Sequence, residues 1–127
     1  MENNMKILPY ATWVVKEEEY KLKLDTAGII KLEESFKSNL ISVLDTASGI
    51  PPLAVMLKIT HQAMLKYNHG IKLKEVYDLF DDYVDEGGSQ TSFFTDTLMS
   101  IFQNGGFFSK NITEEMSGQL EKAKEMI

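Results

Sequence analysis

The chain has 127 residues, a net charge of −6 and no cysteine, so it suits one domain without disulfides, thiolate metal sites or thiol nucleophiles. All 13 positive charges are lysines, and the lack of arginine with the acidic balance disfavours nucleic acid and other polyanions as partners. No apolar run approaches the roughly 20 residues of a membrane span. The N-terminus also lacks the pattern of a secretory signal, so we expect a cytoplasmic protein that does not enter membranes.

Residues 7–25 predict a β-hairpin. The first half is β-branched and aromatic around Trp13, and the second half alternates apolar and charged residues with period two. We expect the turn near Lys16 to Glu18. The predicted inward residues are Tyr20, Leu22 and Leu24, and the predicted outward residues are Glu19, Lys21 and Lys23.

Helices are predicted over residues 26–106. Asp25 or Thr26 can cap a first helix that runs to about Lys37, because their side-chain oxygens accept from the free amides of the first turn. A short helix follows to Leu44. The apolar stripe expected on the first helix consists of Ile29, Ile30, Leu32 and Phe36.

The segment from about Pro52 to Tyr67 is apolar nearly all round and predicts the central core helix. Gly70 follows, and we expect it to supply the left-handed residue that commonly ends a helix. Methionine suits either a core or an adaptable binding surface, and helical spacing favours the core for three of the seven methionines. These are Met56, Met64 and Met99.

The next predicted helix, Lys72 to Glu86, has an apolar side and an acidic side, and Gly87-Gly88 ends it. Ser89 or Thr91 can cap the last helix, which ends near Asn104. The apolar side is predicted to contain Leu73, Val76, Leu79, Phe80, Tyr83 and Val84. The residues of the last helix that recur at helical spacing are Phe93, Phe94, Leu98, Ile101 and Phe102.

These elements predict a mainly α (α+β) fold: a multi-helix bundle with an N-terminal β-hairpin and a peripheral C-terminal helix. Residues 1–112 are expected to form a single globular domain. Residues 113–127 carry only a thin apolar seam, so we expect a C-terminal helix or a mobile tail there.

The sequence supplies no recognisable catalytic or metal-binding motif. His61 and His69 lie eight residues apart without an HExxH pattern, and the acidic run from Asp81 to Gly87 does not keep the register of a calcium-binding EF-hand loop. No serine has a G-x-S-x-G context, and no glycine-rich phosphate loop follows a strand. We therefore predict a protein that is not an enzyme and that needs neither a metal nor a cofactor.

The acidic side of the predicted Lys72–Glu86 helix is the best candidate for a functional surface. Its carboxylates lie three or four residues apart, and each like-charged pair at i, i+4 destabilises a helix by about 0.2 to 0.5 kcal/mol. Two interpretations remain open: a solvated face that keeps the protein in solution, or a docking stripe for a partner rich in lysine or arginine. The candidate partner-binding residues are Asp78, Asp81, Asp82 and Asp85.

Turn glycines and core residues carry a resemblance to one family. They are Pro51-Pro52-Leu53 through Tyr67-Asn68-His69-Gly70, Val76 through Tyr83, Glu86-Gly87-Gly88, and Gly105-Gly106-Phe107-Phe108. In these segments the chain resembles the tail assembly chaperones of long-tailed phages and prophages of Gram-positive bacteria. The resemblance spans roughly Tyr20 to Phe108.

That resemblance implies a chaperone that binds the tape-measure protein, keeps it soluble, and helps to recruit tail-tube protein during tail assembly. The tape-measure protein and the tail-tube protein are thus the expected partners, and self-association is a further possibility. The family's frameshifted long forms imply that this chain corresponds to a short form. The alternative is a structural adaptor of a phage tail or head-tail connector that is retained in the particle.

Overall fold

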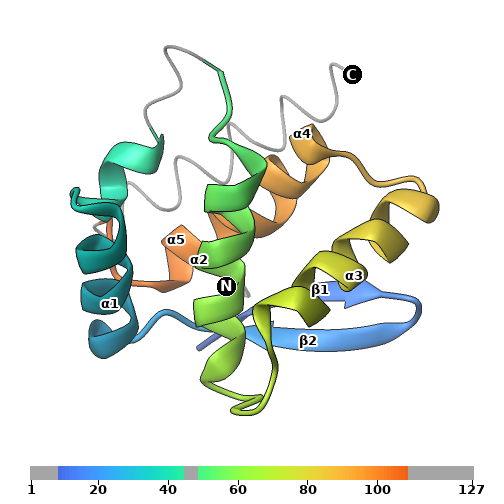
Figure 1. The fold of residues 1–127 in the computed structure, drawn as a ribbon, viewed down its shortest axis with the longest axis horizontal. Helices are drawn as coiled ribbons and strands as arrows, with labels where there is room; N and C mark the ends of the chain where they lie inside the picture. Colours follow the sequence, from blue (N-terminus) through green and yellow to red (C-terminus); the bar gives the residue numbers. More distant parts are fainter. Residues whose placement is uncertain (1–8, 45–48, 109–127) are drawn as a thin grey trace, which may run out of the picture.

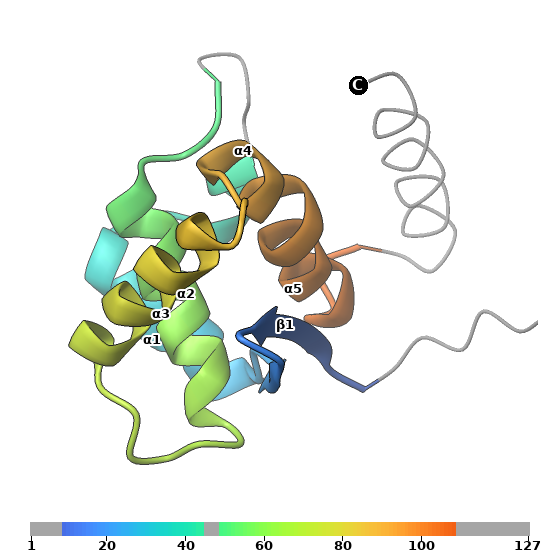
Figure 2. The ribbon, with the colours of Figure 1, turned by 90° about the vertical axis from the view of Figure 1, so that its right-hand side faces the viewer.

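The computed structural model describes residues 9–44 and 49–108, and it has the predicted mainly helical α+β fold with an N-terminal hairpin. The strands β1 (Ala11–Val15) and β2 (Glu18–Leu22) precede the helices α1 (Thr26–Phe36), α2 (Leu53–Leu65) and α3 (Leu73–Asp85). Helix α2 lies between α1 and α3 (Figure 1). Figure 2 shows the hairpin below the last helical segment. The predicted C-terminal helix lies outside the described residues.

The hairpin closes through a two-residue turn at Lys16 and Glu17. Both residues have positive φ, 50° and 68°, which matches the right-handed twist of the strands, and Val15 pairs with Glu18 across the turn. Leu22 and Leu24 are buried as predicted, and Tyr20 is half-buried. The outward prediction was wrong for Lys23, whose ammonium donates to the Asn104 carbonyl at 2.6 Å and is partly buried.

Helix α1 begins as the sequence predicts. The Asp25 carboxylate accepts from the Gly28 amide at 2.9 Å, which satisfies one of the free donors of the first turn. The predicted apolar stripe is only partly buried, because Leu32 faces the core whereas Ile30 is 48% exposed. A short 3₁₀ helix, η1 (Leu40–Leu44), follows.

Helix α2 is the core helix, in agreement with its apolar composition. The three methionines favoured as core residues, Met56, Met64 and Met99, are all buried. The helix ends at Leu65, short of the predicted Tyr67, and Gly70 does not have a positive φ. The prediction that Gly70 supplies a left-handed residue at the end of this helix was therefore wrong. The buried residues of α2 are Met56, Leu57, Ile59, Thr60, Ala63 and Met64.

Helix α3 ends at the predicted glycine pair in a Schellman motif. Gly87 has φ of 105°, its amide donates to the Val84 carbonyl at 2.9 Å, and the Gly88 amide donates to the Tyr83 carbonyl at 3.0 Å. Ser89 then caps the last helix by accepting from the Ser92 amide at 3.0 Å. These bonds satisfy backbone groups at the C-terminal end of α3 and at the N-terminal end of the last helix, and they fix the turn between the two helices.

The last helix contains a π-helical segment that the sequence pattern did not predict. It consists of α4 (Gln90–Ser92), the π segment η3 (Phe93–Leu98) and α5 (Met99–Asn104). The Met99 amide donates to the Phe94 carbonyl, five residues back. The wider turn places Thr97, Leu98 and Met99 all in the core, although a regular α-helix spreads three consecutive residues over more than half its circumference.

Aromatic rings fasten the hairpin to the helices. Trp13 of β1 packs edge-on against Phe93 and Tyr83, with ring centroids 5.0 and 5.8 Å apart, and Phe80 packs edge-on against Phe93 at 5.4 Å. Such edge-to-face pairs stabilise by roughly 0.5 to 1.5 kcal/mol beyond their buried area. This cluster holds the hairpin turn close to the C-terminal end of α3.

Candidate functional site: an acidic surface beside an apolar groove

The four predicted aspartates lie on the outer part of α3, but they have different surroundings. Asp81 and Asp85 are exposed and form no ion pair with any other described residue. Asp78 lies 3.4 Å from the Lys74 ammonium in an exposed pair one turn apart. Asp82 is the least accessible, because its side chain is 35% exposed and lies 3.2 Å from the Lys16 ammonium.

The hairpin turn therefore occupies part of the predicted docking stripe. Lys16 places its ammonium on Asp82 and donates its backbone amide to the Glu86 carboxylate at 2.9 Å. Both contacts join residues about 70 positions apart, so helical periodicity could not reveal them. Asp82 has a partner within the fold, and Asp78 has one in its exposed pair with Lys74, so Asp81 and Asp85 are the aspartates of the stripe without an ion-pair partner among the described residues.

The same turn extends the acidic surface beyond α3. Glu17, Glu18 and Glu19 are exposed on the hairpin. Partial burial, together with the carboxylates of Glu18 and Asp82, raises the pKa of the Tyr20 phenol above its ordinary value, which places charges from both elements near one ring. The sequence shows the three consecutive glutamates plainly, but only the tertiary structure brings one of them, Glu18, close to Asp82 of α3. We name the set Glu18, Asp78, Asp81, Asp82, Asp85 and Glu86 the acidic surface.

An apolar groove lies between α2 and α3 and meets the acidic surface at Asp81. It encloses about 270 Å³, and Asp81 is its only charged lining residue among those described. Tyr77 contributes a ring that is 44% exposed. The α2–α3 groove, as we call it, is lined by Leu53, Ala54, Leu57, Tyr77, Phe80 and Asp81.

The prediction for Val84 was wrong in a way that matters for this groove. The sequence places Val84 on the buried side of α3, whereas the structure leaves it 44% exposed. Tyr77 and Val84 are seven residues apart, so they share one face of the helix two turns apart. Apolar surface thus continues from the groove along α3, next to the aspartates.

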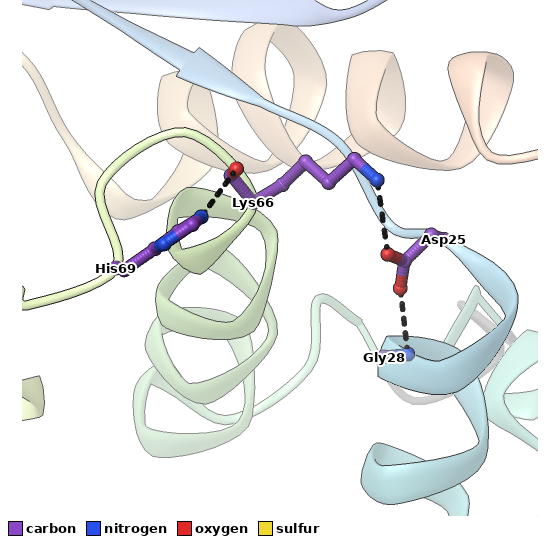
Figure 3. Close-up of polar contacts among 4 residues, drawn as sticks. All are labelled: Asp25, Gly28, Lys66 and His69. Atoms are coloured by element: carbon purple, nitrogen blue, oxygen red, sulfur yellow. Dashed lines mark hydrogen bonds and ion pairs between the residues drawn. The ribbon is translucent and has the colours of Figure 1, made fainter.

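The two histidines do not meet at a shared site. His61 Nε2 lies 2.9 Å from the Ile71 carbonyl oxygen, and His69 Nε2 lies 3.2 Å from the Lys66 carbonyl oxygen. Figure 3 shows Lys66 reaching from α2 to Asp25, whose other carboxylate oxygen caps α1 at Gly28. Within residues 9–44 and 49–108, no three histidine, aspartate or glutamate side chains come close enough together to hold a metal ion.

A second charged hollow, of about 320 Å³, lies on the α1 side of α2. Its cationic groups belong to Lys23, Lys31 and Lys66, yet Lys23 is held by Asn104 and Lys66 by Asp25. The hydrogen bond from the Gly28 amide is the largest cause that lowers the pKa of the Asp25 carboxyl, and Lys66 lowers it further. The Asp25 carboxylate thus occupies the N-terminal end of α1, where an anion could otherwise bind. The hollow is therefore part of the capping of α1.

Residues 10–125 match the model of a protein family described as a family of unknown function (DUF6096). The chain belongs to this family. The match includes the hairpin and every described helix, so the acidic surface and the α2–α3 groove lie inside the family's shared region. No curated protein and no solved structure matches this DUF6096 member. None of its described helices has the length and apolar character needed to cross a membrane.

In this DUF6096 member, charge and apolar surface adjoin where α3 meets α2. Carboxylates attract a cationic partner over distances of about 10 Å, and an apolar groove then gives that partner a place to bury side chains. The arrangement suits reversible binding of a protein segment.

Proposed function

We propose that this protein is a phage tail assembly chaperone that binds and solubilises the tape-measure protein and helps to recruit tail-tube subunits. One observation carries the proposal: an acidic surface, built from α3 and the hairpin turn, adjoins an apolar groove. A chaperone for a long helical client needs many weak contacts that combine charge attraction with apolar burial. In this role the protein acts in the host cytoplasm, without catalysis or a cofactor, through protein–protein contacts.

The resemblance to tail assembly chaperones supports the proposal from a different direction. Its segments coincide with α2, α3 and the Schellman turn at Gly87-Gly88, which together frame the α2–α3 groove. The residues that resemble the family therefore shape the surface on which the proposal depends.

Co-expression with the neighbouring tape-measure protein tests the proposal. We expect more soluble tape-measure protein with this chain than without it, and less with the variant D78N/D81N/D85N. Asp82 is left unchanged because it pairs with Lys16. The single substitutions D81N and E34Q, each removing one exposed carboxylate, form a matched pair, and only D81N is expected to weaken capture.

Two outcomes contradict the proposal. If the client is no more soluble with this protein than without it, the chaperone function is wrong. If the protein remains in purified particles at a fixed number of copies, it is the structural adaptor instead. Insensitivity of capture to both D78N/D81N/D85N and salt would remove the acidic surface from the mechanism.

A further inference from the structure

The size and lining of the α2–α3 groove suit protein side chains. Pockets that enclose drug-sized ligands have volumes of about 300 to 1,000 Å³. The groove, at about 270 Å³, falls just below that range, and its lining is apolar except for Asp81. A hollow of this size and character fits one or two aliphatic side chains presented by another element.

The apolar surface is elongated along α3. Tyr77 lines the groove and Val84 lies two turns further on, each with 44% of its surface exposed. Two helical turns extend roughly 10 Å. An amphipathic helix presents its anchor residues at i, i+3 or i+4, and i+7, which matches a line of this length.

The charges beside this line are mainly negative, since Lys74, which pairs with Asp78, is one cation among several carboxylates. Asp78, Asp81 and Asp85 follow one another at spacings of three and four residues, parallel to the Tyr77–Val84 line. On the α2 side, Lys58 turns toward α1, where its ammonium bonds to Ser35 Oγ at 2.9 Å. No described lysine therefore lines the groove.

We propose that the α2–α3 groove binds an amphipathic helix of a partner protein whose apolar side chains are flanked by lysine or arginine. The anchors pack against Leu57, Tyr77 and Phe80, and the flanking cations lie beside Asp81 and Asp85. This inference deepens the proposed function. It rests on that function for the statement that the helix belongs to the tape-measure protein.

Charge decides between this occupant and the other candidates. A second copy of the chain has a net charge of −6. Residues 109–127 of the same chain contain three lysines and four glutamates, so they carry no excess of positive charge. Only a partner with a basic helix complements the aspartates along the groove.

A labelled model peptide tests the inference on the full chain. The probe is an amphipathic helix of about 18 residues, with leucines on one face and lysines on both flanks, and its twin has glutamates in place of the lysines. Fluorescence anisotropy gives the affinities. We expect the lysine peptide to bind, the glutamate peptide not to bind, and binding of the lysine peptide to weaken as salt is raised.

Two substitutions at exposed positions probe the apolar contacts. Y77Q removes the exposed ring, and A54F fills the groove without changing charge. We expect each substitution to weaken binding of the lysine peptide by at least about five-fold. I30Q is the matched control for Y77Q, because Ile30 is a large hydrophobic residue of similar exposure on α1, and it should leave binding unchanged.

The charge contact is tested in the same assay. We expect D81N to weaken binding of the lysine peptide about two- to five-fold, as for the loss of an exposed ion pair, and the control E34Q to have no effect. Equal affinities of Y77Q and I30Q, or equal binding of the two peptides, would overturn the inference. So would a concentration-dependent dimer that Y77Q abolishes, since the occupant would then be a second copy.

Failure of the inference and failure of the chaperone function are distinguishable. If Y77Q and A54F bind no peptide but still solubilise the tape-measure protein, the function stands and the groove is not its binding site. If the peptide behaves as expected and the tape-measure protein stays insoluble, the groove binds a basic helix of some other protein and the chaperone function is wrong.

Discussion

The adjacent glycines after α3 should respond to alanine for opposite reasons. At Gly87, φ is 105° and no atom lies within 4 Å of an added Cβ, so G87A adds only backbone strain, about 1 to 2 kcal/mol. At Gly88, the added Cβ meets the Tyr83 ring at 2.4 Å, so the ring must move by about 1 Å to reach ordinary contact.

That ring has little freedom to move. Its hydroxyl lies 2.6 Å from Ser92 Oγ, and the ring forms edge-to-face pairs with the rings of Trp13 and Phe93. Overpacking of this kind costs about 1 to 3 kcal/mol, and the lost hydrogen bond adds about 1 kcal/mol. We expect G88A to lower the free energy of unfolding by about 2 to 4 kcal/mol, and thus the urea midpoint by roughly 1 M or more.

A double-mutant cycle separates the two mechanisms. Y83A removes the whole ring, so in that background the cost of G88A should fall below about 0.5 kcal/mol, while the cost of G87A should not change. Urea unfolding followed by the fluorescence of Trp13, the single tryptophan, supplies all the values. An equal cost of G88A with and without the tyrosine ring would refute the steric explanation.

Two further predictions concern stability. Asp25 caps α1, so D25A should lower the free energy of unfolding by about 1 kcal/mol. The pKa of Asp25 in the folded protein is lowered from 3.8. The stability that the carboxylate contributes should therefore be complete above pH 3.8 and disappear as the pH falls through the lowered pKa. Unfolding of both proteins at pH 7 and pH 3 checks this, and a difference independent of pH would contradict it. Phe93 is fully buried against three aromatic rings, so F93A should cost about 3 to 5 kcal/mol, whereas T91A, at an exposed position in the same helix, should cost far less. Thermal unfolding measures both, and similar melting temperatures would show that the cluster does not hold the hairpin in place.

The sequence determined the local elements because their signals are local. Alternating residues around Leu22 predict the hairpin, the Asp25 side chain predicts the start of α1, and Gly87-Gly88 predict the end of α3, all of which the structure confirms. The π turn at Phe93–Leu98 was not predictable in this way, since the burial of three consecutive residues depends on what packs around the helix.

The candidate site was only half determined by the sequence. Periodicity places the aspartates of α3 on its outer part, but it cannot show that Lys16 pairs with Asp82 or that Glu18 of the hairpin lies near the same aspartate. Nor can it show that Val84 stays exposed or that Tyr77 and Asp81 line a groove with α2. Such relations depend on how the elements pack, and helical spacing describes one element at a time. The sequence therefore determined which residues are charged, and the tertiary structure decided which of those charges remain available to a partner.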